Sequence, residues 1–544
     1  MKKGEIYEVK IERLDFPNKG VAYIENVPVI VKNTLPGQEV SIRITKKKKD
    51  RAEGRVLECI KSSEFECREK MCSFYPECGG CTYQSVPYEK QLELKLGMVR
   101  RLLAAEHRRD DLIKDMIPSP SETAYRNKME YSFGDEIKDG PLTLGLHKKG
   151  STYDILPTED CILVNDDYNK IVRCVREFCS EKKLPYYHKM SHEGYLRHLL
   201  VRRSASDGDI CIAIVTSSQM NFDFGELSEK LTAIKTEGRI TGILHIVNDS
   251  MADVVKSDET KILYGRDHFY ETILGLRFKI TPFSFFQTNT KGAERLYKAA
   301  ADMCPGLEDS VVFDLYCGTG TITQILASRA KKVIGVEIVP EAVEAAKENA
   351  AMNGIDNCEF ICGDVLKVID DITEKPDFLV LDPPRDGIHP KALPKLCAYG
   401  VENILYISCK PTSLARDLIL FEEAGYSVVG GVCVDMFPQT ANVETVCLLS
   451  QRKPDTTIEV NLDISELEVS SAETKATYEE IKSYVLKKFG LKVSNLYIAQ
   501  VKRECGIVER INYNLPKTEG NRVPQCPEDK RKAIKDAFIH FQMI

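Results

Sequence analysis

Hydrophobic and polar residues change their spacing more than once along this chain of 544 residues. Over residues 1–60 they alternate in short runs broken by glycine and proline, as in Val40-Ser-Ile-Arg-Ile44. Alternation in short runs is typical of strands, and turns at 18–20 and 35–37 fit a small antiparallel barrel of the OB-like kind. Over residues 61–285, strand-like and helix-like segments alternate without one clear motif, which predicts a central α+β domain.

From Val311 onward, short apolar strands alternate with helices, which is typical of a parallel sheet covered by helices on both faces. A strand at 311–315 is followed by a glycine turn, a helix from Ile322 and a second strand at 332–336. Further strands are expected at 378–381 and 404–408. Residues 286–452 are therefore predicted to form an α/β domain.

The end of the chain has a different character. Residues 453–473 are acidic and polar, which predicts a linker. An amphipathic helix is expected from Thr477 to Phe489, stopped by Gly490, and a second helix with a basic end at 494–503. Two short helices with a tight turn resemble a helix-turn-helix within 474–544. A small helical domain that packs on the enzyme or on a partner is the slightly preferred interpretation.

Composition places the chain among globular proteins, with 43% hydrophobic and 29% charged residues. The net charge of −7 excludes a molecule that is basic throughout, so any contact with nucleic acid must depend on local patches. The basic run 46–49 is one candidate for an RNA phosphate contact, and a solvated loop is an equally good interpretation. Neither a signal peptide nor an apolar run of about 20 residues is found, so we expect a cytoplasmic protein without a membrane span.

The 19 cysteines are odd in number and scattered, which argues against a secreted disulfide framework. Three of them are close together, in the spacing C-x5-C-G-G-C at Cys72, Cys78 and Cys81. Thiolates at this density favour zinc or an iron–sulfur cluster, and a triplet with a distant fourth ligand favours the cluster over the paired spacing of zinc sites. Candidates for the fourth ligand are Cys161, which we prefer, Cys67 and Cys59.

The glycine turn after the first strand of the α/β domain has the pattern D-x-x-x-G-x-G. Gly318 and Gly320 allow the backbone to approach a nucleoside ligand closely. Glu337 ends the second strand 17 positions past Gly320, where its carboxylate can accept hydrogen bonds from a ribose diol. Strand, loop, helix, strand and acid in this order make a strong signal. The loop pattern resembles the S-adenosylmethionine loop of class I methyltransferases rather than the G-x-G-x-x-G of NAD enzymes. This resemblance implies a methyl donor as the ligand and places Asp364, after the next strand, at its adenine end.

Two further strand ends carry reactive groups. Asp382 follows the strand 378–381 and is held rigidly by two prolines, and Cys409 follows the strand 404–408. We expect these strands to pair about 4.8 Å apart, so that both side chains flank one pocket beside the methyl donor. Glu444 begins another strand at the same end of the domain. A lone cysteine is usually a buried structural thiol, and these neighbours argue against that interpretation.

A cysteine, an acid and a methyl donor fit the methylation of carbon 5 of a pyrimidine. Addition of a thiolate to C6 makes C5 nucleophilic, and a base must later remove the C5 proton. We therefore predict Cys409 as the nucleophile and Glu444 as the base. Asp382 is predicted to hydrogen-bond the uracil edge or the cofactor.

These motifs together resemble the RNA uracil-C5-methyltransferase family, close to the bacterial 23S rRNA enzymes with a TRAM domain and a [4Fe–4S] cluster. The resemblance covers residues 1–450. It implies that the barrel is a TRAM domain, that 286–452 is a class I (Rossmann-like) S-adenosylmethionine methyltransferase domain, and that the product is 5-methyluridine in 23S rRNA. The implied site residues are Cys409 as nucleophile, Glu444 as proton acceptor, Cys72, Cys78, Cys81 and Cys161 as cluster ligands, and Gln287, Tyr316, Glu337 and Asp382 as cofactor-binding positions, with Thr321 and Asp364 as weaker matches.

One residue departs from the family pattern F-P-x-T-x-H-V-E, because Asn442 stands where histidine is expected. Methylation of tRNA uracil and a non-catalytic role in RNA binding or assembly are the alternatives. Methylation of an exocyclic amine or a protein amide is disfavoured, since such enzymes resemble N/D-P-P-Y where this chain has Asp382-Pro-Pro-Arg385. We expect a monomer in which the cluster is structural or positions the RNA.

Overall fold

The computed structural model describes residues 1–67, 69, 72–107, 109, 111–251, 258–451, 478–505 and 526–541. The chain divides into two compact units, Met1–Lys453 and Pro454–Ile544. The predicted linker over 453–473 lies outside the described residues. Within the described ranges, no helix combines the length and the apolar composition that a membrane crossing requires.

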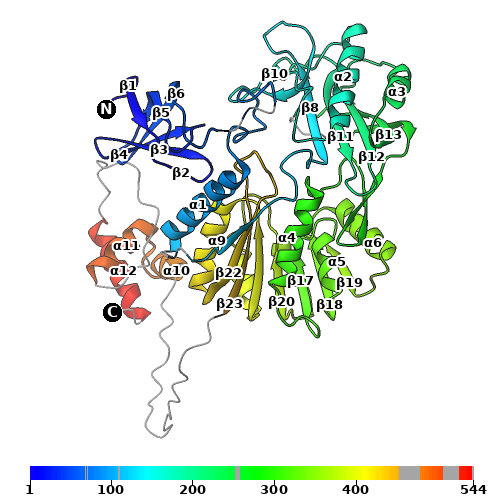
Figure 1. The fold of residues 1–544 in the computed structure, drawn as a ribbon. Helices are drawn as coiled ribbons and strands as arrows, with labels where there is room; N and C mark the ends of the chain where they lie inside the picture. The colour runs from blue at the N-terminus through cyan, green and yellow to red at the C-terminus, as the bar shows by residue number, and fades with distance from the viewer. Residues whose placement is uncertain are drawn as a thin grey trace. The chain divides into compact units, whose positions relative to one another are not determined.

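A six-stranded sheet forms the N-terminal part of the first unit (Figure 1). Its strands are β1 (Ile6–Lys10), β2 (Arg13–Asp15), β3 (Lys19–Ile24), β4 (Val27–Lys32), β5 (Glu39–Lys47) and β6 (Ala52–Lys61). They lie in the order β1-β5-β6-β4-β3-β2. Alternate residues of β5, namely Val40, Ile42 and Ile44, enter its core. The predicted short strands are confirmed, and each buries one face because its apolar residues alternate. The expectation of a purely antiparallel arrangement is wrong at one pair, since β4 and β6 run parallel.

The central part of the first unit is built on a seven-stranded mixed sheet. The sheet order is β10-β9-β8-β11-β12-β13-β14, with strands β8 (Lys128–Gly134), β9 (Thr143–His147), β10 (Ile155–Leu156), β11 (Leu196–Arg203), β12 (Asp209–Thr216), β13 (Arg239–Val247) and β14 (Glu259–Gly265). Helices α2 (Asp166–Glu181) and α3 (Gly225–Thr232) share its core. The cations of β11 do not form a solvated face, because Arg197 and Arg202 are both buried.

The C-terminal sheet of the first unit has eight strands in the order β19-β18-β17-β20-β21-β23-β22-β7. They are β17 (Val311–Leu315), β18 (Lys332–Glu337), β19 (Cys358–Cys362), β20 (Phe378–Leu381), β21 (Asn403–Ser408), β22 (Tyr426–Val434), β23 (Glu444–Gln451) and β7 (Asp115–Ile117). Strands β17 to β21 are parallel, and β23 runs antiparallel between β21 and β22. The expected pairing of 378–381 with 404–408 is confirmed by the partners Leu379 and Ile404.

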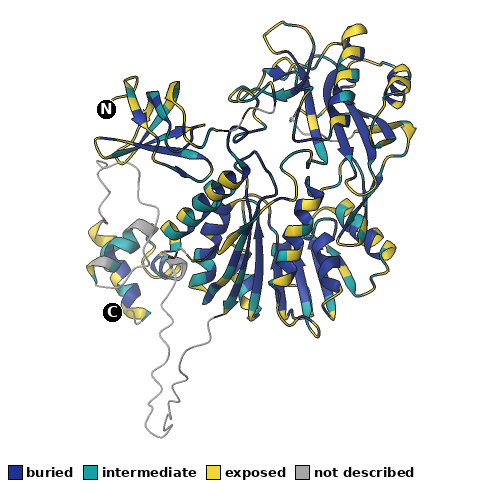
Figure 2. Ribbon diagram, in the orientation of Figure 1, coloured by how far each residue is buried: buried dark blue, intermediate teal, exposed yellow. Residues whose placement is uncertain are grey.

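Helices cover both faces of this sheet. They are α1 (Tyr88–His107), α4 (Thr290–Asp302), α5 (Thr321–Ala327), α6 (Pro340–Met352), α7 (Val365–Val368), α8 (Leu393–Ala398) and α9 (Pro411–Glu423). Val380 of β20 belongs to a core shared with α4 and α5, and the adjacent Leu379 to a core shared with α1, α8 and α9. Figure 2 shows the buried strands between helices with exposed outer faces. Burial on both sides explains why β20 is apolar at every position.

Two elements reach this sheet from residues before 285. β7 pairs in parallel with the end of β22, where Val432 lies opposite Asp115, and α1 packs on α9. A hairpin of β15 (Phe269–Ile273) and β16 (Leu276–Ile280) leads into α4. The expected boundary between 285 and 286 therefore separates the two sheets but not α1 and β7. A three-residue strand has too little pattern to be recognised in a sequence.

The second unit contains helices α10 (Tyr478–Phe489), α11 (Asn495–Glu504) and α12 (Glu528–His540). Gly490 has a φ of 67° and ends α10, as predicted. The two expected helices are confirmed, and α12 was not predicted. The unit has its own apolar core, whose buried members include Ile481, Ile498, Ile534 and Phe538.

Candidate active site

The loop between β17 and α5 is shaped by residues with positive φ. Tyr316, Gly318 and Gly320 have φ values of 73°, 55° and 75°. A Cβ atom on Gly320 would lie 2.8 Å from Phe360, so a side chain does not fit there. At Gly318 the nearest atom to such a Cβ is 4.0 Å away, on Phe285. The loop is therefore packed on one side and open to a ligand at Gly318.

Glu337 ends β18 beside this loop. One carboxylate oxygen accepts a hydrogen bond from the Gly318 N–H at 3.1 Å, and the other accepts one from the Val339 N–H at 3.0 Å. A carboxylate offers about four acceptor positions, so acceptor capacity remains for a ribose diol. The structure places Glu337 where the sequence predicted it, already oriented by the glycine loop.

Asp364 and Thr321, the weaker candidates for cofactor binding, also have structural roles. Asp364 caps α7, since its carboxylate accepts a hydrogen bond from the Leu366 N–H at 3.0 Å. Thr321 is buried as the first residue of α5. The pKa of Tyr316 is raised to about 12, first by burial and then by Asp364, so the phenol and this carboxylate lie near each other.

The segment before α4 brings Gln287 to the same region. The side chain of Gln287 hydrogen-bonds the buried Tyr297 of α4, whose pKa is raised first by burial and then by Asp382. The neighbouring aromatic residues differ in exposure. Phe285 is 72% exposed, whereas Phe286 is buried. Phe285 is a functional candidate that sequence reasoning missed, because an apolar run by itself predicts burial.

Cys409, Glu444 and Asp382 converge at the carboxyl edge of the sheet. Leu381 pairs with Tyr406 across β20 and β21, and Ser408 pairs with Thr445 across β21 and β23. Cys409 and Glu444 are the next residues in that second register, so they lie opposite each other. Asp382 leaves the adjacent strand at the same edge.

The charged forms of these three groups are all disfavoured. Burial raises the pKa of Cys409 to about 11, with smaller contributions from Glu444 and then Asp382. Burial, followed by Asp382, raises the pKa of Glu444 to about 8. The pKa of Asp382 is raised to about 7 by burial and then by Asp314. Arg385 opposes the shifts at Cys409 and Glu444, which places this cation beside the pair.

Asp314 lies behind the site at the first residue of the D-x-x-x-G-x-G pattern. It is fully buried and accepts a hydrogen bond from the Thr323 hydroxyl at 2.6 Å. Burial raises its pKa to about 6, and its second oxygen has no hydrogen-bond partner. A buried acceptor in this state favours a donor or a positive charge arriving nearby.

The four predicted cluster ligands lie in the central part of the chain. Cys72, Cys78, Cys81 and Cys161 are 9%, 7%, 6% and 7% exposed. Burial raises the pKa of Cys81 to about 12, and the other three thiols add to the shift, so the four face a common region. The competitors Cys59 and Cys67 are exposed. No group of three or more histidine, cysteine or acidic side chains among the described residues is arranged to hold a single metal ion.

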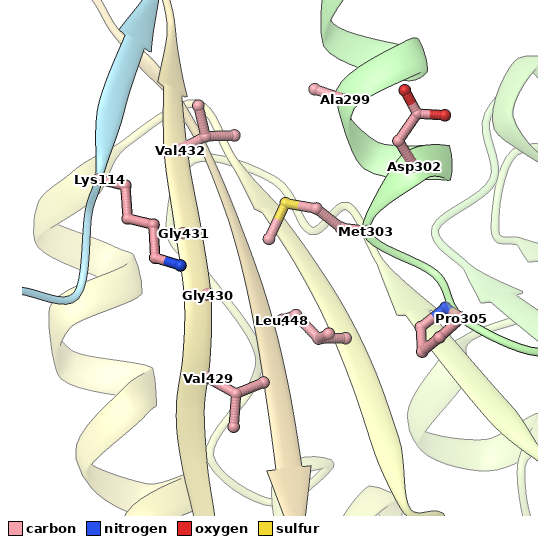
Figure 3. Close-up of a pocket in the computed structure, with 10 residues that line it drawn as sticks. All are labelled: Lys114, Ala299, Asp302, Met303, Pro305, Val429, Gly430, Gly431, Val432 and Leu448. Atoms are coloured by element: carbon pink, nitrogen blue, oxygen red, sulfur yellow. The ribbon is translucent and has the colours of Figure 1, made fainter.

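A hollow of about 550 Å³ lies elsewhere, between the last turn of α4 and the middle of β22 and β23. Figure 3 shows Met303 between Val432 and Leu448, with Lys114 on the left and Asp302 and Pro305 on the right. It contains none of the predicted site residues. Because open sheets bind ligands at the carboxyl ends of their strands, we assign the site to the glycine loop and Cys409 instead.

The strand order, the glycine loop after β17 and the acid after β18 together define a class I S-adenosylmethionine-dependent methyltransferase. Family comparisons agree: a methyltransferase domain model matches residues 307–408, a TRAM domain model residues 1–57, and a tRNA (uracil-5-)-methyltransferase model residues 365–452. An uncharacterized RNA methyltransferase of Clostridium tetani is 46% identical over 84% of this chain and 99% of its own length. The chain belongs to the RNA uracil-5-methyltransferase family and is an RNA methyltransferase.

Two further relatives support this assignment. An uncharacterized RNA methyltransferase of Caldanaerobacter subterraneus is 47% identical over 83% of this chain and 100% of its own length. The tRNA (uracil-54, C5)-methyltransferase of Pyrococcus abyssi, solved with S-adenosyl-L-homocysteine, superposes with a TM-score of 0.64 at 25% identity. That comparison covers 81% of this chain and all of the other.

Proposed function

We propose that the protein methylates carbon 5 of uracil in RNA, giving 5-methyluridine, through a covalent bond between Cys409 and C6 of the base. The observation that carries this proposal is the convergence of Cys409, Glu444 and Asp382 beside the glycine loop. An N-methyltransferase has no use for a thiol opposite a carboxyl group. A uracil C5-methyltransferase needs both, because C5 is too poor a nucleophile unless C6 is first attacked.

Cys409 acts first in this mechanism. Its thiolate sulfur forms a bond to C6, and the C5–C6 electron pair moves onto C5 and the O4 enolate. C5 then forms its bond to the methyl carbon, which leaves C5 with both a methyl group and its original hydrogen. S-adenosylmethionine, when bound, would supply this methyl group as an electrophile; the bond between the methyl carbon and the sulfonium sulfur would break, and its electron pair would leave with S-adenosylhomocysteine.

Glu444 completes the reaction. Its carboxylate removes the C5 proton, the freed electron pair re-forms the C5–C6 double bond, and the Cys409 sulfur leaves as the thiolate. Asp382, on the adjacent strand, is suited to hydrogen-bond the uracil edge. Since a pKa of about 7 gives Asp382 both protonation states near neutrality, it can donate or accept there.

The raised pKa values of the site fit a cationic cosubstrate. A sulfonium carries a positive charge, and a positive charge close to buried acids favours their ionised forms. We assign Gln287, Tyr316, Glu337 and Asp382, with Gly318 and Gly320, to the binding of S-adenosylmethionine. Thr321 and Asp364 would support this site through the backbone they hold.

The four buried thiols fit an iron–sulfur cluster, which would supply the positive charge that makes four facing thiolates tolerable. The support for this is that the thiols contribute to one another's raised pKa values, Cys161, Cys78 and Cys72 at Cys81 and Cys72 and Cys78 at Cys161. We propose Cys72, Cys78, Cys81 and Cys161 as the ligands of a [4Fe–4S] cluster. The proposed mechanism contains no redox step, so the role of the cluster is structural or one of RNA positioning.

We propose 23S rRNA as the substrate, on the family resemblance of the TRAM domain and the four cysteines, and a monomer acting in the cytoplasm. The second candidate is tRNA, which the likeness to the Pyrococcus abyssi tRNA (uracil-54, C5)-methyltransferase favours.

Mass-spectrometric mapping of 5-methyluridine in 23S rRNA and tRNA, from cells with and without the gene, tests the proposal. We expect 5-methyluridine in 23S rRNA to be lost when the gene is deleted and to return with a plasmid copy. Loss in tRNA alone would transfer the proposal to the second candidate. An unchanged 5-methyluridine content in both RNAs would contradict uracil methylation altogether.

A further inference from the structure

The loop that leads from β22 to Glu444 is held by segments outside the methyltransferase strands. It runs over residues 435–443, and Glu444 follows as the first residue of β23. Helix α1, the residues just after Cys81, Tyr125 and Asn289 all bond to it. The sheet pairs Glu444 with Val434, and the loop before it is held largely by parts of the chain that precede the α/β domain.

A buried ion pair anchors the start of this loop. The Lys95 ammonium of α1 lies 2.7 Å from the Asp435 carboxylate and donates a second hydrogen bond to the Phe437 carbonyl at 3.0 Å. Both charged side chains are 0% exposed. Burial lowers the pKa of Lys95, and Asp435 opposes this shift. A fully buried pair contributes little to stability compared with apolar residues, so its main physical effect is to fix one geometry.

A second contact from α1 holds the middle of the loop. Gln91 donates to the side-chain oxygen of Gln439 at 2.9 Å, and the Gln439 N–H donates back to Gln91 at 2.9 Å. Gln439 has a φ of 67°, which is uncommon for a residue with a side chain. Such a conformation persists only when its surroundings determine it, and reciprocal bonds from a buried helix residue do so.

The segment that carries Cys81 holds the same residue from the other side. The N–H groups of Thr82 and Tyr83 both donate to the Gln439 carbonyl, at 2.7 and 3.0 Å. The Tyr125 hydroxyl donates to the neighbouring Pro438 carbonyl at 2.9 Å. The chain thus passes directly from a proposed cluster ligand to the loop of the proposed base.

We infer that Lys95 and Gln91, with the backbone of Thr82 and Tyr83, are positioning residues for Glu444. They hold the loop 435–443 so that the carboxylate meets the C5 proton of the methylated adduct. This inference rests on the proposed function, because it concerns the step in which Glu444 takes that proton and the Cys409–C6 bond breaks. The residues that follow Cys81 thereby gain a defined structural role, since they support the loop that orients the base.

Loss of the positioning residues should have a kinetic effect that general destabilisation of the fold would not produce. If the loop shifts while Cys409 and the glycine loop stay in place, the adduct still forms and accepts the methyl group. Only its breakdown slows, so the fraction of enzyme bound covalently to RNA at steady state rises while kcat falls. Displacement of a catalytic group by about 1 Å can cost roughly 100-fold in rate, so we expect kcat to fall by roughly 10- to 100-fold.

Two variants test the inference on the full-length protein purified without oxygen. Gln91→Met removes both side-chain bonds to Gln439 at nearly constant volume, and the double variant Lys95→Met/Asp435→Asn removes the ion pair without leaving an unpaired charge. Arg100→Met is the matched control, since Arg100 lies on α1 but donates to the Ile113 carbonyl and not to the loop. Unmethylated rRNA from cells lacking the gene and radiolabelled S-adenosylmethionine are the substrates.

The measurements are kcat, KM for RNA, S-adenosylhomocysteine affinity and the covalent fraction on a denaturing gel. We expect a lower kcat and a larger covalent fraction in both variants, with unchanged cofactor affinity, and wild-type behaviour in Arg100→Met. A folded Gln91→Met protein with wild-type kcat and covalent fraction overturns the inference, as does a parallel loss of adduct and cofactor affinity. If Glu444→Gln itself accumulates no adduct, the proposed function fails instead, so the two failures are distinguishable.

Discussion

The protein contains two thiol sites. Burial raises the thiol pKa at both, and the sites differ in the groups that surround the thiols. The first is Cys409, and the second is the group of four buried cysteines, Cys72, Cys78, Cys81 and Cys161. Burial is the largest cause of a raised pKa at both sites, and it raises the pKa to about 11 for Cys409 and for Cys161. The next contributions differ in kind. Around Cys409 they come from the carboxyl groups of Glu444 and Asp382, whereas around the four cysteines they include neighbouring thiols, those of Cys72 and Cys78 at Cys161, together with the Asp160 carboxyl at Cys72 and Cys78.

We infer from this difference that Cys409 needs a nearby positive charge only during the reaction, whereas the four cysteines need one at all times if they are ionised. A single thiol among acids can stay protonated at rest and ionise when a sulfonium and a base arrive. Four facing thiols cannot all ionise without a resident cation, so that site is suited to a bound metal cluster. The backbone also differs, because Cys409 follows a strand paired on both sides, while Cys72 lies in a bend, Cys78 forms an isolated β-bridge with Lys148 and Cys81 lies in a segment without regular secondary structure.

The sharpest way to test this contrast is to remove one thiol from each site. We expect Cys409→Ala to abolish RNA methylation completely, because no other group can add to C6, while S-adenosylhomocysteine binding and iron content stay at the wild-type level. Isothermal titration, iron analysis and methyl transfer to RNA measure the three properties. Methylation above background by the purified variant would contradict the nucleophile assignment.

Replacing the base should separate formation of the adduct from its release. Glu444→Gln keeps the size of the side chain but cannot take the C5 proton. A positioned base contributes about 10² to 10⁴ in rate, so we expect a loss of that order in kcat with a covalent RNA–protein species on denaturing gels. Cys409→Ala combined with Glu444→Gln is the control and should show no such species.

Substitution of one of the four cysteines is expected to change the metal content of the protein more than it changes the methylation reaction. We expect Cys81→Ser to lose most of the iron and sulfide of the anaerobically purified protein and to unfold at a lower temperature, since binding a metal centre contributes to folding free energy. Cys59→Ser, at an exposed cysteine, is the matched control. Zinc without iron in the wild-type protein, measured by elemental analysis, would contradict the cluster.

The buried acids predict a pH dependence of stability with a defined sign. Glu444 has a pKa of about 8 when folded and about 4.3 when unfolded. The folded state binds this proton more tightly, so the stabilisation is complete below the unfolded pKa and is lost as pH rises toward 8. The loss is on the order of 1.4 kcal/mol per pH unit, and thermal unfolding at pH 5 to 8 should show a flatter profile for Glu444→Gln. Equal slopes would contradict the raised pKa.

The smallest effect is expected at the departure from the family pattern. Asn442 is exposed, and its N–H donates to the Thr440 hydroxyl at 3.2 Å. Because exposed substitutions rarely change free energies by more than about 0.5 kcal/mol, Asn442→His should change kcat less than about threefold. A larger gain would mean that the histidine of the family pattern assists the proton acceptor, and that this chain has lost that assistance.

The local sequence predicts much of the α/β domain because its signals are short-range. Apolar runs mark β17, β20 and β21, and glycine marks the turn that ends at Gly320. The residues that follow these strands are then the site candidates, and Cys409 and Asp382 are two of them. Helix α9 begins at Pro411, although proline fits both a turn and a first helical position and does not by itself distinguish them.

Other features depend on contacts between residues far apart in the chain. Strand β7 is three residues long and joins a strand more than 300 positions later, which no local pattern reveals. Phe285 is exposed against its apolar context, because the glycine loop beside it leaves open space. The Lys95–Asp435 pair spans 340 positions, and a lysine within a charged helix gives no sign that it will be fully buried.

The sequence by itself determined the reactive groups: a thiol, two acids and a glycine loop, each at a strand end, and the three closely spaced cysteines Cys72, Cys78 and Cys81. Their chemistry is a property of the residue type and of local backbone pattern. Only the tertiary structure decided their pKa values and orientations, because these depend on burial and on charged residues that are distant in sequence. It placed Glu444 opposite Cys409, set Asp382 beside them, and attached the loop of Glu444 to the segment of Cys81.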